Sequence, residues 1–409
     1  MNLEIRKIKK EEADSLARVG ANAFPGGGNS QENVCDWIEG TVNNENPNDT
    51  FYGAFQGQQL VGGMRYLNYQ MNLLSQKVEI GGLGFVCVDL LHKKEKIAKA
   101  MLNEFINHYR DNDVNMVMLY PFSIPFYKKM GFGIGTKMHR FEIKPTSFPK
   151  GDSKEHLSFY TKEDNEQLLD FYNRFVEKTN GMIFRKKFNL SNKIKTVVYK
   201  EDGLIKGYMT FLFEQIEDCQ YLMNLRLYGF LYENQRVLKE FSTFLHTQAD
   251  QVERIIYTSQ DDALSHYLTD PSNGHHETFK SEYLESYISA PGAMYRVTNV
   301  GGIFDDLSDH NFGGQDCKLK VTVRDTFIPE NDGSTVIEFE KGEIKDIDTV
   351  GESDVEVTLD ISDFSSLLVG GINFKSLYKY GLVSISDENY IDILEKIFLS
   401  DKPFCTTFF

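Results

Sequence analysis

The alternation of hydrophobic and polar residues over positions 1–150 predicts a mixed α/β domain. Apolar runs on both sides of the turn Gln56-Gly57-Gln58 are typical of a hairpin, and the glycine-bearing run at 78–88 predicts a longer strand. Between Ile97 and Tyr109 the apolar residues recur at helical spacing. The expected strands are 51–55, 60–66, 78–88 and 115–119, and the expected helices are 11–23, 97–109 and 124–130.

Residues 151–285 repeat this pattern in weaker form. A strand at 196–199, the turn Glu201-Asp202-Gly203 and a strand at 206–211 resemble the first hairpin. A further strand at 224–231 precedes a helix at 237–249. We interpret the two segments as a diverged repeat. Because few single residues match, the coincidence of two α/β patterns is the alternative.

Residues 286–409 differ from both segments. Strict alternation predicts half-buried strands, and the turns Asp332-Gly333 and Lys341-Gly342-Glu343 are typical of hairpins. The expected strands are 321–323, 335–339 and 354–359, and the expected helices are 364–369, 374–380 and 390–399. Together they predict an α+β arrangement in which helices cover an antiparallel sheet. We therefore expect three domains, 1–150, 151–285 and 286–409.

Composition narrows the possible partners. The chain has 409 residues, too many for one hydrophobic core. Its net charge of −16 disfavours nucleic acid and anionic membrane surfaces and favours cationic partners such as amines, although solubility alone would also explain it. The five cysteines are scattered and form no Cys-x-x-Cys pair, so we expect a reducing, cytoplasmic location and no metal site. No apolar run is long enough to cross a membrane.

A cationic loop follows the glycine-bearing strand. The stretch from His92 to Lys96 carries four cationic or potentially cationic residues and leads into the helix that begins near Ile97. Backbone N–H groups at a helix N-terminus, with lysines beside them, form an anion site suited to pyrophosphate. If the strand parts from its neighbour, its free edge can pair with an extended amide chain. A solvated charged surface is the alternative for the lysines, and His92 itself is more often structural.

Two further segments carry candidate chemistry. In Tyr120–Phe132 a strand end, a short helix and a glycine turn bring Tyr127 near the free strand edge. The chain ends on Phe408-Phe409, and we expect this aromatic end to be buried. A buried α-carboxylate must be paired, because an isolated buried charge is too costly.

These motifs resemble those of GNAT acetyl-CoA-dependent N-acetyltransferases. The resemblance rests on Val86-x-Val88, on the loop from His92 to Ala98 and on the segment Phe126–Phe132. The whole chain is similar to the Eis (enhanced intracellular survival) branch of that family. The resemblance implies an active GNAT domain, a degenerate GNAT-like domain and a sterol-carrier-like domain. It also implies a homohexamer in which the terminal carboxylate enters the active site of the first domain.

The resemblance implies roles for individual residues. Tyr127 would be the general acid, the carboxylate of Phe409 the general base, and the backbone N–H of Val86 a donor to the thioester carbonyl. The expected acetyl-CoA contacts are Val86, Cys87, Val88, Lys94, Glu95, Lys96, Ile97, Ala98, Lys99, Phe122 and Ser123. The expected substrate contacts are Trp37, Phe85, Asp36 and Phe408. Tyr127, Trp37 and Phe85 are equally explained as core residues, Ser123 as a helix cap, and the terminal phenylalanines as an anchor.

The chain departs from the family pattern in its loop. Lys96 stands where the family usually has the central glycine, and the second domain lacks a cationic loop, so we expect one acetyl-CoA site per chain. The function implied is acetylation of primary amines on polycationic, aminoglycoside-like substrates. A protein-lysine or small-metabolite N-acetyltransferase is the first alternative. A lipid- or ligand-binding protein without catalysis is the second.

Overall fold

The computed structural model describes residues 3–26, 30–44, 46–188, 190–191, 193–217, 221–275 and 284–409. The chain forms two compact units. Residues 1–135, 293–403 and 407–409 make up the first unit, and residues 136–292 and 404–406 make up the second. No helix in these described ranges is long and apolar enough to cross a membrane.

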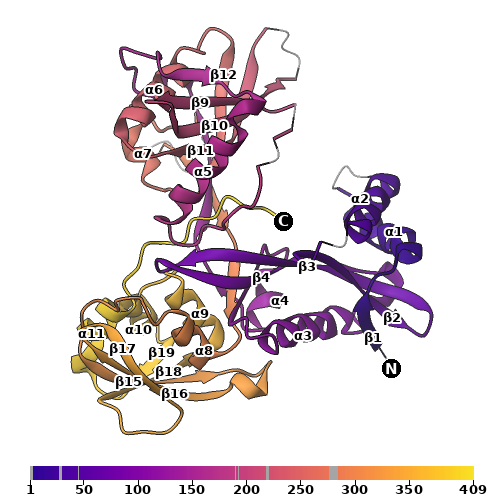
Figure 1. The fold of residues 1–409 in the computed structure, drawn as a ribbon, viewed down its shortest axis with the longest axis vertical. Coiled ribbons are helices and arrows are strands. Elements are labelled where there is room, and N and C mark those ends of the chain that lie inside the picture. The colour runs from indigo at the N-terminus through magenta and orange to yellow at the C-terminus, as the bar shows by residue number, and fades with distance from the viewer. Residues whose placement is uncertain are drawn as a thin grey trace. The chain divides into compact units, whose positions relative to one another are not determined.

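The first unit contains a seven-stranded sheet in the order β1-β2-β3-β4-β5-β14-β6 (Figure 1). Its strands are β1 (Leu3–Lys7), β2 (Asp49–Gln56), β3 (Gln59–Leu73), β4 (Gln76–Val88), β5 (Met116–Leu119), β6 (Gly133–Ile134) and β14 (Met294–Val297). Only β4 and β5 are parallel to each other, and the other neighbours are antiparallel. A parallel pair needs a crossover connection, and helix α3 (Ile97–Arg110) provides it.

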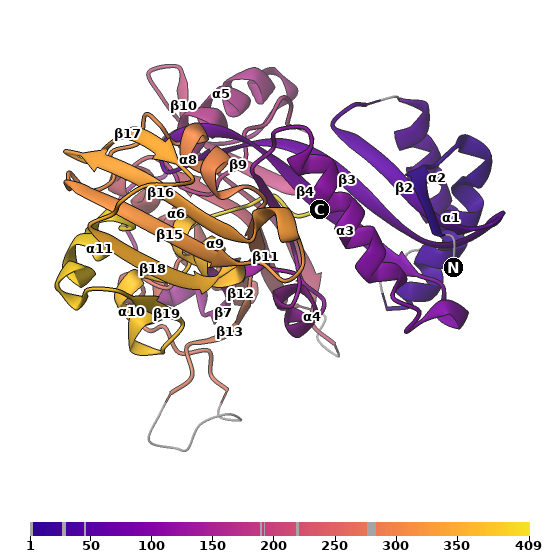
Figure 2. The same cartoon turned by 90° about the horizontal axis from the view of Figure 1, so that it is seen from below.

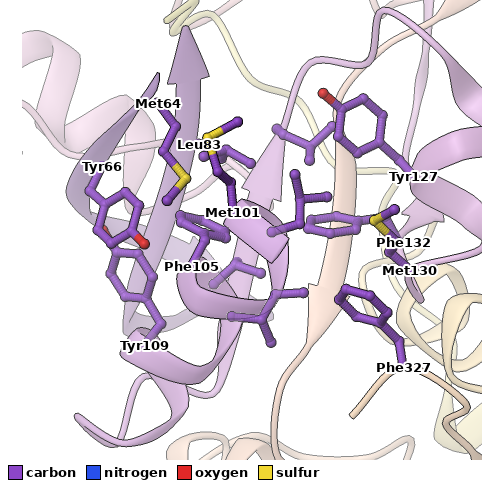
Figure 3. Packing of buried hydrophobic residues seen from close by; sticks show 14 of the residues in the cluster. Met64, Tyr66, Leu83, Met101, Phe105, Tyr109, Tyr127, Met130, Phe132 and Phe327 are labelled. Carbon is purple, nitrogen blue, oxygen red and sulfur yellow. The ribbon is translucent and has the colours of Figure 1, made fainter. Parts of the chain in front are cut away.

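The predicted helices of this part of the chain are confirmed. Besides α3, they are α1 (Ala13–Ala23) and α4 (Ile124–Lys128), and α2 (Gln31–Asn43) is an additional helix. Helix α2 begins after Ser30, whose Oγ accepts a hydrogen bond from the N–H of Asn33. The buried side of α3 carries Met101, Phe105 and Tyr109, three of the residues at helical spacing that predicted it. They pack in the core shown in Figure 3.

The second unit repeats this topology, which confirms a tandem GNAT-like arrangement. Its sheet has the order β13-β7-β12-β11-β10-β9-β8. Its strands are β7 (Lys137–Ile143), β8 (Leu157–Phe159), β9 (Lys195–Glu201), β10 (Leu204–Gln215), β11 (Met223–Tyr232), β12 (Val252–Ser259) and β13 (Tyr287–Pro291), and its helices are α5 (Asn165–Val176), α6 (Gln235–His246) and α7 (Leu264–Tyr267). Strands β9, β10 and β11 are antiparallel, and α6 leads to β12 parallel to β11. The series β9, β10, β11, α6 and β12 therefore corresponds to the series β2, β3, β4, α3 and β5 of the first sheet.

The first unit also contains a five-stranded sheet in the order β17-β16-β15-β18-β19, shown in orange and yellow in Figure 2. Its strands are β15 (Cys317–Arg324), β16 (Gly333–Glu340), β17 (Glu343–Asp348), β18 (Val355–Asp360) and β19 (Val383–Ile385), and its helices are α8 (Val300–Asp306), α9 (Ile361–Leu368), α10 (Phe374–Lys379) and α11 (Ile391–Ile397).

Two expectations for this sheet are wrong in detail. The sheet is mixed, because β15 and β18 are parallel. Asp332-Gly333 is not a tight turn: the connection from β15 to β16 contains a 3₁₀ turn at Pro329–Asn331, and Asp332 Oδ1 accepts a hydrogen bond from the N–H of Asp325. The Lys341-Gly342 hairpin is confirmed, and both residues have positive φ.

Strand membership does not follow the linear segments. Strand β7 lies before residue 150 but belongs to the second sheet, whereas β14 lies after residue 286 but belongs to the first sheet. The chain therefore leaves the first sheet after β6 and returns to it at β14. Boundaries drawn from local patterns could not show this exchange, because strand pairing is decided by partners far apart in sequence.

Candidate active site

The short parallel pair of β4 and β5 creates an open strand edge. Strand β4 pairs with β3 along its length but with β5 only from Gly81 to Leu83. Beyond Leu83 the two strands part, and within the described chain no strand pairs with β4 on that side at 84–88. Strand β5 ends at Leu119, and Tyr120 begins the connection to α4. An extended ligand with amide groups can pair with the open edge as an added strand would.

Phe85 lies where the two strands part. Its φ is 52°, and the register of β4 against β3 shifts there, as in a β-bulge. Its ring packs so closely on Gly20 of α1 that a Cβ at Gly20 would overlap it. Trp37 and Phe51 contact Phe85 edge to face, with ring centroids 5.4 and 5.6 Å away. Two of the four predicted substrate contacts, Phe85 and Trp37, therefore meet, and Trp37 is 39% exposed.

Sequence reasoning missed Arg65, which lies over Trp37. Its Cζ is 4.9 Å from the centre of the Trp37 ring. The guanidinium donates two hydrogen bonds to Asp49, of 2.6 and 2.5 Å, so its charge is neutralised. The sequence signal that could have identified Arg65 is a lone arginine in the otherwise apolar strand 60–66. Asp36, the predicted amine ligand, is exposed on α2 directly before Trp37.

Asp89 holds the loop after β4. Its Oδ1 accepts a hydrogen bond from the N–H of Leu91 and lies 3.0 Å from Nδ1 of His92. The contact with His92 is the main reason that the pKa of Asp89 is lowered. His92 is therefore a structural residue. Lys94 and Lys96 follow with φ of 71° and 65°, a left-handed conformation that normally favours glycine. Lys96, which stands where the family usually has its central glycine, thus has a backbone conformation typical of glycine.

The N-terminus of α3 offers an anion site. Lys96 is its N-cap residue, and its side chain makes no capping hydrogen bond. Lys93, Lys94 and Lys96 have exposed side chains and no ion pair with the described part of the chain. Free N–H groups of a first helical turn, together with cations, attract phosphates.

The other predicted contacts of this region differ in what they can offer. The side chains of Ile97 and Cys87 are buried, and burial raises the pKa of the Cys87 thiol to about 12, so both offer only their backbone. Glu95 accepts a hydrogen bond from Gln56, and Lys99 Nζ lies 5.6 Å from the centre of the Phe327 ring. Val86, Val88 and Ala98 are half-buried against the core.

Replacing Lys96 with glycine is expected to raise the free energy of unfolding by roughly 0.5 kcal/mol, because relief of the left-handed backbone outweighs the entropy gained by the unfolded chain. Urea unfolding would measure this. The matched control is Lys93→Gly, since Lys93 has a φ of −63° and gains no relief. The free energy of unfolding of that control should fall by about 0.5–1 kcal/mol. Equal losses in the two variants would contradict the argument.

Tyr127 is a buried tyrosine on α4. Its ring contacts those of Phe122, Phe126 and Phe132. Figure 3 shows its hydroxyl directed away from Met130 and Phe132, and the hydroxyl has no hydrogen-bond partner among the described residues. Burial raises the pKa of Tyr127 above its ordinary value of 10. The phenol therefore stays protonated at neutral pH and is free to donate.

The residues just before Tyr127 lie at the start of α4. Ser123 is the N-cap residue of α4, but its side chain makes no capping hydrogen bond, so the expected capping role is not seen. Its carbonyl instead accepts hydrogen bonds from the N–H groups of Phe126 and Tyr127. Phe122 is exposed and packs on the ring of Tyr127.

A buried ion pair fixes the other end of α4, and no local motif predicted it. Arg296 of β14 donates a hydrogen bond to the carbonyl of Met130, and its guanidinium lies 2.5 Å from Asp325 Oδ2. Both side chains are fully buried. Asp325 also accepts hydrogen bonds from the N–H groups of Phe327 and Ile328. Residues far along the chain therefore position the helix that carries Tyr127.

The end of the chain lies on the open part of β4. A Cβ placed on Gly84 would be 3.5 Å from the carboxyl carbon of Phe409. The ring of Phe409 contacts Tyr69 and Tyr120, at 5.4 and 5.5 Å between centroids. Tyr120 also donates a hydrogen bond to the carbonyl of Thr407. The terminal carboxylate therefore lies close to β4 at Gly84, at a distance that a Cβ would still fit.

The expectation of a buried aromatic end is wrong in part. Phe408 is 62% exposed and stacks on Tyr120, and Phe409 is half-buried. Phe408 therefore remains accessible to a substrate.

A groove of about 540 Å³ lies next to α4. Its lining includes Lys128, Lys129, Phe327, Asp360 and Asp363. Lys128 pairs with Asp363 at 3.4 Å, which leaves Lys129 as the cation without an ion pair on this face of the described chain.

One group of potential metal ligands is present elsewhere in the described residues. Glu155, His156 and Glu240 have ligand atoms within 4.8 Å of one another. His156 Nδ1 lies 2.7 Å from Glu240 Oε1, so the group already forms an ion pair or hydrogen bond. The expectation that the chain has no metal site stays a prediction.

Comparisons with known proteins agree with this geometry. Residues 4–135 match the family model of the acetyltransferase (GNAT) domain, and residues 307–406 match that of the sterol carrier protein domain. No curated protein matches the sequence significantly.

Several solved structures are similar over 100% of both chains. One is a GCN5-related N-acetyltransferase from Anabaena variabilis, with a TM-score of 0.83 and 18% identity. Another, a probable N-acyltransferase from Enterococcus faecalis, has a TM-score of 0.78 and 17% identity. Eis1 from Mycobacterium abscessus has a TM-score of 0.76 and 16% identity. At these identities the likeness establishes the shared fold.

Proposed function

We propose that this N-acetyltransferase, which joins a GNAT acetyltransferase domain to a sterol carrier protein domain, acetylates primary amines of polycationic substrates such as aminoglycosides. GNAT-fold proteins use acetyl-CoA as the co-substrate. The observation that carries the proposal is the contact of the Phe409 carboxylate with Gly84, where β4 parts from β5. It brings a potential base to the strand that presents the open edge.

The residues present fit acetyl-CoA. The open edge of β4 at 84–88 suits the amide groups of pantetheine, and the α3 N-terminus with Lys94 and Lys96 suits the pyrophosphate. Lys96 is exposed, so its side chain is a further cation at this site. Lys99 lies over Phe327, which lines the groove next to α4, and this groove would take the nucleotide end.

Acetyl transfer forms one N–C bond and breaks one C–S bond, while the amine loses a proton and the sulfur gains one. In our proposal the Phe409 carboxylate takes one proton from the ammonium group, which gives the neutral amine. After this amine attacks the thioester carbon, Tyr127 donates its hydroxyl proton to the departing sulfur, and the resulting phenolate takes up the second proton that the nitrogen gives up. The raised pKa of Tyr127 keeps that proton in place at neutral pH. The backbone N–H of Val86 would polarise the thioester carbonyl.

The substrate side favours amines with several positive charges. Trp37 is partly exposed, Asp36 precedes it on an exposed helix surface, and Arg65 is neutralised by Asp49. The chain as a whole carries a net charge of −16. Exposed Phe408 and Trp37 offer aromatic faces to a cation. Such a site selects charge rather than shape, which suits substrates with several reactive amines.

We expect acetyl-CoA-dependent thiol release with multiply charged aminoglycosides at a kcat/KM at least tenfold above that with monoamines of similar size, a difference of about 1.4 kcal/mol. The purified full-length chain would be assayed with an aminoglycoside, a lysine peptide and a monoamine. Turnover with the peptide but not with the aminoglycoside would favour the protein-lysine alternative. No thiol release with any amine would overturn the proposal.

The remaining alternatives concern the third sheet and the assembly. The core beside the five-stranded sheet contains the buried, mutually contacting rings of Phe304, Phe312, Phe339 and Phe364. This favours a packed core over a lipid tunnel. By resemblance we propose a cytoplasmic homohexamer. Light scattering of the purified chain would test the assembly.

A further inference from the structure

The second sheet has an opening equivalent to that of the first. Strands β11 and β12 are parallel and paired only up to Leu227 and Tyr257. Strand β11 continues to Tyr232 and β12 to Ser259, so the two strands part as β4 and β5 do. A pocket of about 290 Å³ lies at this point, close to the lower end of the range for ligand sites. It is lined by Phe175, Thr179, Phe230, Leu231, Tyr232, Tyr257, Ser259, Asp261, Leu264 and Phe404.

The helix next to this pocket does not offer a phosphate site. Helix α6 begins after Asn234, whose Oδ1 accepts hydrogen bonds from the N–H groups of Arg236 and Val237. The Asn234 side chain therefore accepts hydrogen bonds from N–H groups of the first turn of α6. In α3, by contrast, the N-cap side chain makes no such bond. Glu233 precedes it and pairs with Arg174 at 3.3 Å. A pyrophosphate would meet carboxylate and amide oxygens here.

The pocket lining has a different chemistry. Its walls are aromatic, with Phe230 and Tyr257 buried and 5.9 Å apart between ring centroids. Asp261 is an exposed carboxylate at the pocket that has no ion pair within the described residues. Its Oδ1 accepts one hydrogen bond, from the N–H of Ala263. The Tyr232 hydroxyl also lacks a hydrogen-bond partner in the described part of the chain.

The pocket is held in shape by its surroundings. Ser259 Oγ accepts a hydrogen bond from the N–H of Asp261, which fixes the backbone that carries the carboxylate. Phe404 closes one wall, and its N–H donates to the carbonyl of Asn180 at 2.8 Å. The N–H of Cys405 donates to Gln260 in the same unit. The site therefore does not depend on a ligand for its formation.

We propose that this pocket binds a small organic amine, with its apolar body between the aromatic walls and its single ammonium group on Asp261. A carboxylate without a cation at the edge of an aromatic pocket favours a cationic ligand over a neutral or anionic one. The aromatic rings add cation–π attraction for the same charge. The residues that line this pocket belong to the second unit, whereas the residues proposed for acetyl transfer belong to the first unit.

Binding to the full-length chain would be measured by calorimetry with three probes of one shape: phenethylamine, 2-phenylethanol and phenylacetate. We expect phenethylamine to bind and the alcohol and the acid to bind at least fivefold more weakly. Asp261→Asn should weaken the binding of phenethylamine about fivefold, the equivalent of about 1 kcal/mol. The affinity for 2-phenylethanol should not change. Asparagine keeps the acceptor for Ala263, so the loop should stay folded.

Two controls separate this pocket from the acetyl-transfer site. Asp250→Asn removes another exposed carboxylate of the same unit and should not alter binding. Acetylation by Asp261→Asn should match that of the unaltered chain, so failure of the proposed acetylation would not affect this result. Leu264→Phe narrows the pocket and should weaken the binding of both phenethylamine and 2-phenylethanol. Equal binding of phenethylamine by the unaltered chain and Asp261→Asn, or equal affinity for the amine and the alcohol, would overturn the proposal.

Discussion

Replacing Tyr127 with phenylalanine is expected to lower kcat by about 10²–10³-fold, the range typical of a lost general acid. The KM for acetyl-CoA should change less than twofold. The variant keeps the ring contacts with Phe122, Phe126 and Phe132 and removes a hydroxyl that has no hydrogen-bond partner in the described chain. The fold should therefore be preserved. Steady-state thiol release and a thermal melt of each variant would measure the two effects.

Tyr66→Phe is the matched control for this variant. Tyr66 is also a buried tyrosine of the same core, and its hydroxyl also lacks a hydrogen-bond partner in the described chain. Its ring packs on Tyr52 and Phe105. Loss of this hydroxyl should leave kcat within twofold. Similar losses of activity in both variants would assign Tyr127 to the core rather than to the chemistry.

The pH dependence gives a second test of Tyr127. Burial raises its pKa above 10, so the folded protein keeps the proton where the unfolded chain begins to release it. The associated stability is fully present below pH 10 and is lost as pH rises further. The acid therefore stays protonated from pH 7 to pH 9, and kcat should not fall over this range. A decline centred near pH 8 would require another acid.

Extending the chain by Gly-Ser after Phe409 is expected to lower kcat/KM for amines by about 100-fold, because an amide replaces the carboxylate that lies on Gly84 and cannot take up a proton. Amidating Phe409 by semisynthesis makes the same change with almost no added volume. Acetyl-CoA affinity, measured by calorimetry, should stay within about threefold, since the α3 N-terminus is untouched.

The control for the extension is Gly-Ser added at the N-terminus, which should leave kcat/KM unchanged. Phe408→Ala tests the anchor separately, because its exposed ring stacks on Tyr120 but supplies no base. It should cost less activity than amidation does. If the amidated chain acetylated amines at the full rate, the chain end would be an anchor only.

Much of the local structure followed from the sequence. Most strands and helices of the first segment, the second hairpin and the helical end of the chain were visible as periods of two and 3.6 residues, which depend only on neighbours. Strands β1 and β7 and helix α2 were not predicted. The cationic loop and the helix start at Ile97 were visible for the same reason. The left-handed backbone of Lys96 was not, because lysine gives no sign of it.

The sequence by itself determined most of the segments that become strands and helices, since each buries its apolar side wherever it packs. The tertiary structure alone decided their partners. It placed β14 in the first sheet, made β15 and β18 parallel, and brought Arg296 and Asp325 together under α4. It also left Phe408 exposed and brought the carboxylate of Phe409 onto Gly84. These contacts join residues that are distant in sequence, and local periodicity carries no information about them.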